Sequence, residues 1–163
     1  MRNIYKTKYI FLLNCCFINI INNENKFICK AIIDKDDFNK IKDSKWRYGN
    51  GYLRESKTNE FLHQRIMGNK PGFVIDHINL NKLDNRKSNL RYVTKRQNAQ
   101  NNNGKGYWKL IKNGLTYWRA EIAINGKRIN LGSYKSEREA KEIRKQAELK
   151  YFGEFSNQTK FNN

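Results

Sequence analysis

The sequence predicts an α+β protein made mostly of short strands with a few short helices. Three observations support this class: apolar runs are short and bounded by turn residues, helical spacing is confined to a few stretches, and two capping-box patterns mark helix starts. The chain of 163 residues is 38% hydrophobic and 13% aromatic with one proline, which is enough apolar material to close a core and argues against disorder. Its length corresponds to one large or two small domains.

Two breaks in the pattern divide the chain. Residues 68–72 contain two glycines and the proline, which interrupt any helix or strand. Residues 101–106 form a polar run with two glycines and no apolar anchor, which is typical of a linker. We therefore expect three segments, at residues 1–70, 71–103 and 104–163.

The first segment is predicted to be rich in strands. The apolar run 9–21 is interrupted by Asn14 and Asn19 and is too short to cross a bilayer of about 30 Å as a helix. A signal peptide is the alternative, but residues 22–25 offer no small-residue cleavage site, so a buried strand or hairpin is favoured. The expected elements that follow are a strand at 27–33, a stretch of near-helical spacing at 36–46 and a short meander at 48–54 and 60–66.

The middle segment predicts two strands followed by a helix. Residues 73–75 are a short apolar run that leads directly into Asp76 and His77, and a polar loop follows at 79–89. Residues 90–93 alternate as a second strand. Thr94 and Gln97 have capping-box spacing, so a helix is expected to start at Lys95 with Asn98 in its first turn.

The last segment predicts three strands and one helix. The strands are expected at 107–112, 117–124 and 127–134, with an Asn-Gly hairpin turn before the third strand. Ser136 and Glu139 form a second capping box. The helical stripe expected to be buried is Ala140, Ile143, Ala147 and Tyr151, with Lys141, Arg144, Lys145 and Glu148 off that stripe. This order predicts an antiparallel sheet with one face covered by the helix and the other face free.

The charge of the chain points to a polyanion as partner. Lys and Arg number 33 against 15 Asp and Glu, a formal charge of +18, and all three segments share the excess. Nucleic acid is the leading partner on this basis, and a membrane surface is the weaker one. The three cysteines, Cys15, Cys16 and Cys29, cannot all pair and have no C-x-x-C spacing, which indicates inert thiols in a reducing, cytoplasmic compartment.

Four polar residues of the middle segment form a candidate site: Asp76, His77, Asn89 and Asn98. Carboxylate and carboxamide oxygens suit a hard divalent cation, and a neutral imidazole can take a proton from an attacking water. Together these groups predict hydrolysis of a phosphodiester bond. The alternative is a surface turn with two capping asparagines in an asparagine-rich chain, and spacing alone leaves both interpretations open.

Residues 76–94, followed by Gln97 and Asn98, resemble the motif of phage- and intron-type HNH homing endonucleases. The upstream residues 51–54 and 62–68 resemble the segment that precedes this motif in the family. The resemblance implies a ββα-metal nuclease unit, with residues 1–70 as its β-rich lead-in. It also implies cleavage of double-stranded DNA with Mg²⁺ or Mn²⁺.

The roles of individual residues follow from this resemblance. It makes His77 the general base and Asp76 and Asn98 the metal ligands, while Asn89 braces the loop and orients the histidine. The family often has glycine where this chain has Leu80, which suggests a different loop geometry. The further candidates are Arg86 or Arg91 at the transition state or on a phosphate, and His63 in a structural or DNA-contact role.

The last segment resembles the Apetala/ethylene-response-factor DNA-binding domain, at residues 106–108, 117–122, 125–134, 139–140 and 151–155. That resemblance implies that the free face of the sheet enters the major groove. Strand alternation independently places the following side chains on the free face: Trp108, Lys112, Tyr117, Arg119, Glu121, Arg128 and Asn130. It places Trp118, Ala120, Ile122, Ile124, Ile129 and Leu131 on the helix side. Each outward charge could read a base, contact a phosphate or only solubilise the surface.

These observations predict a site-selective DNA endonuclease of the homing type. Double-stranded DNA is the expected partner, with no membrane and no obligate protein partner. The alternative is a DNA-binding protein or regulator without catalysis, in which the HNH unit is degenerate. A third interpretation, an RNA-binding protein, rests on charge alone.

Overall fold

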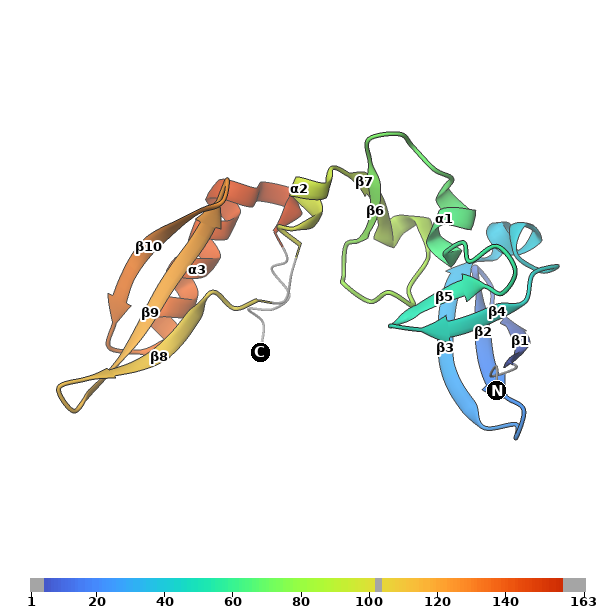
Figure 1. Cartoon of the computed structure of the whole chain (residues 1–163), viewed down its shortest axis with the longest axis horizontal. Helices are drawn as coiled ribbons and strands as arrows, with labels where there is room; N and C mark the ends of the chain where they lie inside the picture. The colour runs from blue at the N-terminus through green and yellow to red at the C-terminus, as the bar shows by residue number, and fades with distance from the viewer. Residues whose placement is uncertain (1–4, 102–103, 157–163) are drawn as a thin grey trace. The chain divides into compact units, whose positions relative to one another are not determined.

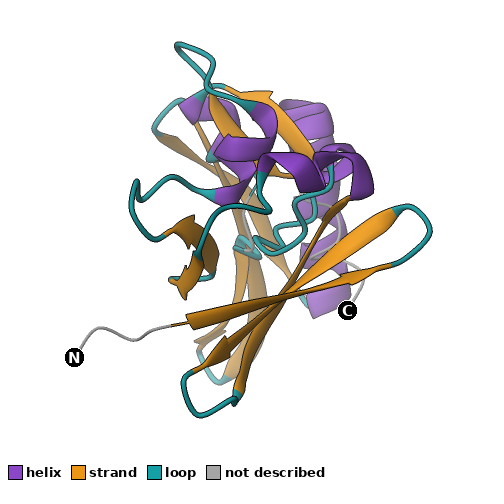
Figure 2. Cartoon of the chain, turned by 90° about the vertical axis from the view of Figure 1, so that its right-hand side faces the viewer, coloured by secondary structure: helices purple, strands orange, loops and turns teal. Residues whose placement is uncertain are grey.

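The computed structural model describes residues 5–101 and 104–156 (Figure 1). Within these ranges the chain is a mixed α+β protein with four small antiparallel sheets, two of three strands and two of two strands (Figure 2). The chain divides into two compact units, Met1–Lys95 and Arg96–Asn163. No helix in the described ranges is long and apolar enough to span a membrane.

The first unit begins with a three-stranded sheet in the order β1-β2-β3. Its strands are β1 (Tyr5–Phe11), β2 (Cys15–Asn22) and β3 (Phe27–Asp34). The hairpin expected within the apolar run 9–21 is confirmed, and its turn is closed by the Leu12 amide donating to the Cys15 carbonyl at 2.9 Å. The strand expected at 27–33 is also confirmed.

One face of this sheet builds the core of the first unit. Cys16, Ile18 and Ile20 alternate along β2 and are fully buried, together with Trp46 and Leu53 from the next hairpin. All three cysteines are free thiols. Burial raises the pKa of Cys29 to about 11, so this thiol stays protonated at neutral pH.

Two predicted elements of the first unit are wrong in type. The helical stretch 36–46 is a short 3-10 helix η1 (Lys35–Lys40), and Trp46 instead opens β4 (Trp46–Gly49), which pairs with β5 (Tyr52–Glu55). The spacing of three residues between Phe38 and Ile41 fits one turn, whereas the following five residues to Trp46 do not. The strand expected at 60–66 is helix α1 (Leu62–Met67).

Helix α1 forms because its buried residues have helical spacing. Leu62 and Ile66 lie four residues apart and both join the core. The side chain of Gln64 closes the first turn, accepting the Phe61 amide at 3.1 Å. A strand would have placed Leu62 and Ile66 on one face but would also have exposed His63, which is buried in the helix.

The middle of the chain forms a second two-stranded pair in the first unit. Strand β6 (Val74–His77) pairs with β7 (Leu90–Val93), and the loop between them ends in a 3-10 turn η2 (Lys87–Asn89). Helix α2 (Lys95–Asn98) begins where predicted and lasts one turn. The loop is attached to β3, because the Ile32 amide donates to the Leu83 carbonyl and the Asn85 amide to the Ile32 carbonyl, both at 2.8 Å.

The second unit is a three-stranded sheet packed on one helix, as predicted. The strands β8 (Tyr107–Lys112), β9 (Leu115–Ile124) and β10 (Lys127–Tyr134) are arranged in the order β10-β9-β8, followed by helix α3 (Glu137–Phe152) and a 3-10 turn η3 (Gly153–Phe155). Ser136 caps the helix as expected, its hydroxyl accepting the Glu139 amide at 3.2 Å. The predicted linker at 101–106 falls partly on residues 102–103, which lie outside the described residues.

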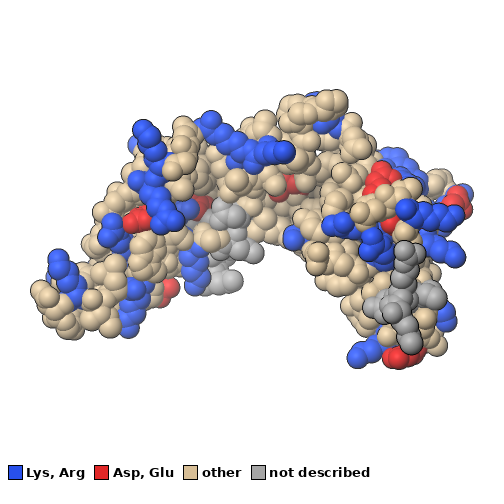
Figure 3. All heavy atoms as spheres, viewed as in Figure 1, with Lys and Arg blue, Asp and Glu red and all other residues tan. Residues whose placement is uncertain are grey.

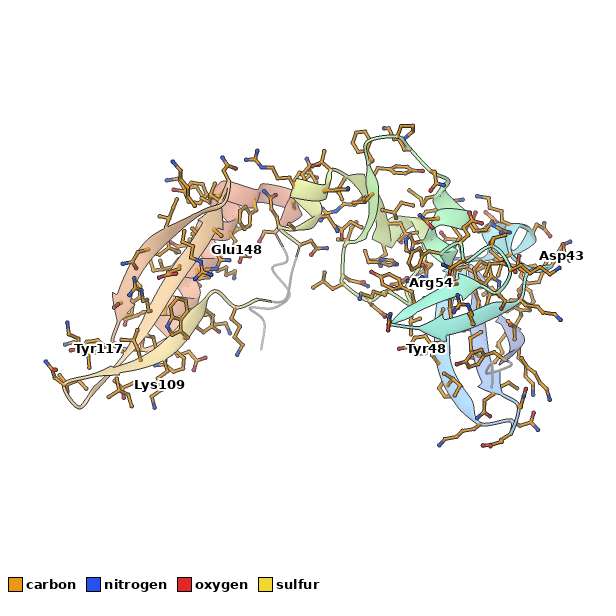
Figure 4. The ribbon with its side chains drawn as sticks, in the orientation of Figure 1. Asp43, Tyr48, Arg54, Lys109, Tyr117 and Glu148 are labelled. Atoms are coloured by element: carbon orange, nitrogen blue, oxygen red, sulfur yellow. The ribbon has the colours of Figure 1, made fainter. Side chains whose placement is uncertain are left out.

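The buried stripe of α3 differs from the prediction. Ala140 and Ala147 are buried as expected, but Phe152 is buried in place of Tyr151, which is exposed. Arg144 and Glu148, expected off the stripe, are both buried and form an ion pair with an Nη2–Oε1 distance of 2.6 Å. Figure 4 labels Glu148 on this helix. The pair is buried because each charge has a partner one turn away, which lowers the cost of removing it from water.

Candidate functional site

Strand β6 ends in an acidic residue and a histidine that both lie inside the first unit. Asp76 and His77 are each 5% exposed. In the pairing of β6 with β7, Asp76 lies opposite Arg91 and His77 opposite Leu90. A strand pair closed by backbone hydrogen bonds therefore fixes the position of both side chains.

Asp76 forms a buried ion pair with Arg91. The Nε and Nη2 atoms of Arg91 lie 3.0 and 2.9 Å from Oδ2 of Asp76. These two contacts to one carboxylate oxygen fix the position of Asp76 relative to β7. Arg91, predicted as a phosphate or transition-state contact, therefore first of all holds the carboxylate that precedes the histidine.

The imidazole of His77 is neutral at neutral pH. Burial lowers its pKa, against the opposing effects of the Asn85 hydrogen bond and the nearby carboxylates Asp76 and Asp84. Its Nε2 atom lies 3.3 Å from Oδ1 of Asn85, a carboxamide that is itself 1% exposed. The group can therefore accept a proton, and a buried neighbour orients its ring.

Aromatic side chains pack against the ring of His77. The ring of His63 meets it edge to face with centroids 5.1 Å apart, and Tyr52 lies 5.6 Å from His63 and 6.1 Å from His77. Phe61 stacks on His63 at 5.1 Å. Burial lowers the pKa of His63 to about 4, with a further contribution from His77, so His63 is neutral too. The structure thus places His63 inside the site, against the candidate base.

Asn89 ties together the two ends of the loop that follows β6. Its backbone carbonyl accepts the Ile78 amide at 2.9 Å, and its Oδ1 accepts the Asn79 amide at 3.0 Å. Its Nδ2 donates to the Asp84 carbonyl at 2.8 Å. These contacts are those of a residue that braces the loop.

Leu80 occupies a strained turn in the same loop. Its φ is 62°, in the left-handed region that favours glycine, and its amide donates to the His77 carbonyl at 2.9 Å. The turn keeps its shape here at a cost in backbone strain. A glycine at this position would adopt the same φ without that cost.

Arg86 is paired with Asp84 within the loop. Its Nε and Nη2 atoms lie 2.8 and 2.6 Å from the two carboxylate oxygens, and Asn79 donates to the same carboxylate at 3.1 Å. The hydrogen bonds from Arg86 lower the pKa of Asp84. The pair stiffens the loop and fixes the orientation of the Arg86 side chain.

Two comparisons with known proteins bear on this chain. The protein-family profile described as HNH endonuclease matches residues 63–100. An uncharacterized HNH endonuclease of Acanthamoeba polyphaga mimivirus is 30% identical over 138 residues, which cover 77% of this chain and 72% of that protein. The chain belongs to the HNH endonuclease family. No solved structure matches it.

In this HNH endonuclease two residues around His77 were not predicted from the sequence, Asn85 and Tyr52. Asn85 contacts His77 directly, yet it was not among the predicted site residues. Asn85 lies eight residues after His77 in the loop, a position that could have indicated it. Asparagine is abundant throughout the chain, so this one did not stand out. Tyr52 was missed as well, because only the packing of β5 against α1 brings it to the site.

The metal-binding residues of the HNH endonuclease stay a prediction. No group of three His, Cys, Asp or Glu side chains suited to a metal is found within residues 5–101 and 104–156. Asp76 lies beside His77 in the first unit, and Asn98 lies at the end of α2 in the second. Their oxygens are of the hard type that Mg²⁺ and Mn²⁺ accept, so the donor chemistry fits such an ion.

The second unit presents the predicted free face of its sheet. Pairing places Trp108 opposite Arg119, Lys112 opposite Leu115, Glu121 opposite Asn130 and Arg128 opposite Ala123. Because paired residues point to the same side of a sheet, these residues share the face away from α3. The face carries both signs of charge, since Arg119 Nε lies 3.0 Å from Glu121 Oε1.

One inward prediction for this sheet is only half correct. Ile129 pairs with the buried Ile122 and so shares its face, but it is 39% exposed. Leu131 packs into the core as predicted, next to a bulge between Asn130 and Gly132. The family match covers residues 63–100, so the Apetala/ethylene-response-factor resemblance of this unit stays a prediction.

Proposed function

We propose that this chain is a homing-type DNA endonuclease in which His77 is the general base for hydrolysis of a phosphodiester bond. The observation that carries the proposal is the placement of His77: a neutral, buried imidazole held by Asn85 directly after Asp76. Membership of the HNH endonuclease family supports nuclease activity on DNA.

His77 takes the proton from the attacking water in this proposal. A base must be unprotonated to act, and burial keeps His77 in that form at neutral pH. The contacts with Asn85 and His63 limit rotation of the ring, so the accepting nitrogen is oriented before the substrate arrives.

Asp76 and Asn98 hold one Mg²⁺ or Mn²⁺ in this proposal. When bound, the ion stabilises the negative charge that develops on the phosphate. Arg91 fixes the position of the Asp76 carboxylate, because its Nη2 atom lies 2.9 Å from Oδ2 of Asp76. Arg91 and Arg86 can also contact a phosphate oxygen in this proposal.

The second unit selects the DNA sequence in this proposal, through the free face of β8, β9 and β10. Support comes from its residues: Arg128 and Asn130 suit guanine and adenine edges, and Glu121 can accept from cytosine. Figure 3 shows basic side chains on both units. A DNA-binding module of the Apetala/ethylene-response-factor type is therefore proposed for residues 104–163.

A plasmid-nicking assay tests the proposed chemistry. His77→Ala is expected to lower the nicking rate by a factor of about 10² to 10⁴ with DNA binding intact. The matched control is Lys57→Ala, an exposed residue of the same unit. Unchanged cleavage by His77→Ala would refute the proposed base. Binding by the wild-type chain without cleavage in Mg²⁺ or Mn²⁺ would favour the non-catalytic DNA-binding alternative.

A further inference from the structure

We propose that the outer face of the β1-β2-β3 sheet holds the phosphate backbone of the substrate DNA. The inference rests on the proposed function, because it takes DNA as the substrate. The inner face of this sheet is committed to the core through Cys16, Ile18 and Ile20. The residues between them along β2 point to the other side.

Strand pairing gathers lysines on this outer face. Lys8 lies opposite Asn19, and Asn19 lies opposite Lys30, so one row crosses all three strands. Lys6 is two residues from Lys8 along β1 and shares the face. All three lysines are exposed. The face therefore carries three ammonium groups, of which that of Lys6 also donates to Oδ1 of Asn25 at 3.4 Å.

The one carboxylate on the described part of this face is already engaged. Asp34 lies at the end of β3 opposite Cys15, and its Oδ2 accepts the Lys87 backbone amide at 2.7 Å. The row formed by Lys8, Asn19 and Lys30 lies four residues away along β3. The lysine row, formed by Lys8, Asn19 and Lys30, therefore contains no carboxylate.

Lys30 is held in the middle of this face. Its Nζ atom lies 4.6 Å from the centre of the Phe17 ring, which holds the amine over the sheet. Oδ1 of Asn19 is buried and has no hydrogen-bond partner among the described residues, but it is an acceptor and does not bind a phosphate oxygen. The lysine ammonium groups therefore supply the phosphate contacts proposed for this face.

The face has a fixed relationship to the candidate base. Ile32 of β3 exchanges backbone hydrogen bonds with Leu83 and Asn85, and Asn85 contacts His77. Each link is a hydrogen bond of the folded core rather than a flexible connection. A phosphate held by the lysine row would therefore set the position of the bound strand relative to His77.

The occupant that fits these features is double-stranded DNA. Ammonium groups on a sheet bind phosphate oxygens as point charges, without reading the sequence. A second copy of this chain is a poor fit, because two such faces would bring lysine rows together and repel. The three lysines are spread over β1 and β3, so they suit an extended polyanion better than a single small anion.

A pair of double variants tests the inference. Lys8→Gln with Lys30→Gln removes two charges from the face, and Lys42→Gln with Lys57→Gln removes two exposed charges elsewhere in the same unit. Binding to a DNA duplex is measured against salt concentration in a His77→Ala background. The first pair is expected to reduce the slope of log K against log[salt] by about 2 and to weaken binding roughly tenfold or more at low salt. The control pair is expected to leave the slope unchanged.

The remaining outcomes decide against the inference. An equal change in both pairs would make the effect general electrostatics, and no change in the first pair would remove the face from DNA binding. If the first pair weakens binding to an RNA duplex but not to a DNA duplex, the face binds RNA instead. If it changes the sedimentation coefficient of the free protein, the face mediates self-association. Thermal unfolding of each variant shows that it is folded. Cleavage by the His77→Ala proteins would refute the proposed base without affecting this comparison.

Discussion

The rings of His63 and His77 meet edge to face with their centroids 5.1 Å apart. The two histidines come from α1 and β6, and both are buried, at 8% and 5% exposure. Edge-to-face contacts between rings are attractive and directional. His63 therefore restricts the orientation of the ring that we propose as the base.

Shortening His63 should slow cleavage without abolishing it. His63→Ala removes the ring that packs against His77, so the nicking rate is expected to fall roughly 10-fold to 100-fold. His63→Phe keeps an aromatic edge against His77 and should retain most of the rate. Single-turnover nicking assays check both variants. Equal losses in the two variants would show that the imidazole of His63 itself is needed, rather than its ring edge.

Stability should fall in mild acid because of His63. Its folded-state pKa is about 4, below the ordinary value of 6.5, so the unfolded chain binds the proton more readily. The stability contributed by a neutral His63 is complete above pH 6.5 and is lost as the pH falls toward 4. The loss amounts to roughly 3 kcal/mol at most.

Urea unfolding at pH 7 and pH 4.5 measures this dependence. Other groups also titrate in that range, so the informative quantity is the difference between wild type and His63→Phe. The variant should lose less stability on acidification than the wild type does. Parallel pH dependences in the two proteins would contradict the buried neutral state of His63.

Asn85 should affect the pH dependence of cleavage as well as its rate. The Asn85 hydrogen bond raises the pKa of His77, against the lowering caused by burial. Asn85→Ala is therefore expected to lower the apparent pKa of the base and to slow nicking about tenfold. Rate–pH profiles of wild type and Asn85→Ala test this. A slower rate with an unchanged profile would assign Asn85 to loop structure alone.

The buried pair of Arg144 and Glu148 should be costly to break and cheap to replace. Arg144→Ala leaves the Glu148 carboxylate buried without its cation, at an expected cost of about 3–5 kcal/mol. The double variant Arg144→Met with Glu148→Leu removes both charges and should be much less destabilised. Chemical denaturation of the full chain distinguishes the two. Similar losses in both variants would show that packing, not the charge pair, sets the stability.

Removing the carboxamide of Asn19 should stabilise the first unit. Asn19→Val removes an unpaired buried oxygen from a central strand, so the free energy of unfolding is expected to rise by about 1 kcal/mol. Urea unfolding of the full chain measures the change. A lower free energy of unfolding in Asn19→Val would contradict the unpaired state of this oxygen.

Local patterns anticipated most strands of the fold and misjudged two elements. Alternation and turn residues placed the three strands of the second unit, and the capping box of Ser136 placed the start of α3. The segments around Phe38 and Leu62 were misjudged, because a few apolar residues fit a helix or a strand equally well. Only packing against the β1-β2-β3 core selected between the two.

The sequence by itself determined the charge of this protein, the position of most of its strands and the motif that contains Asp76, His77 and Asn89. These features depend on residues close together in the chain, because the periodicity of apolar side chains and the turn residues can be recognised there. Tertiary structure alone decided that His63 and Asn85 surround His77 and that Lys8 and Lys30 share one row. Such contacts join elements distant in sequence, so they exist only once the sheets pair and the core closes.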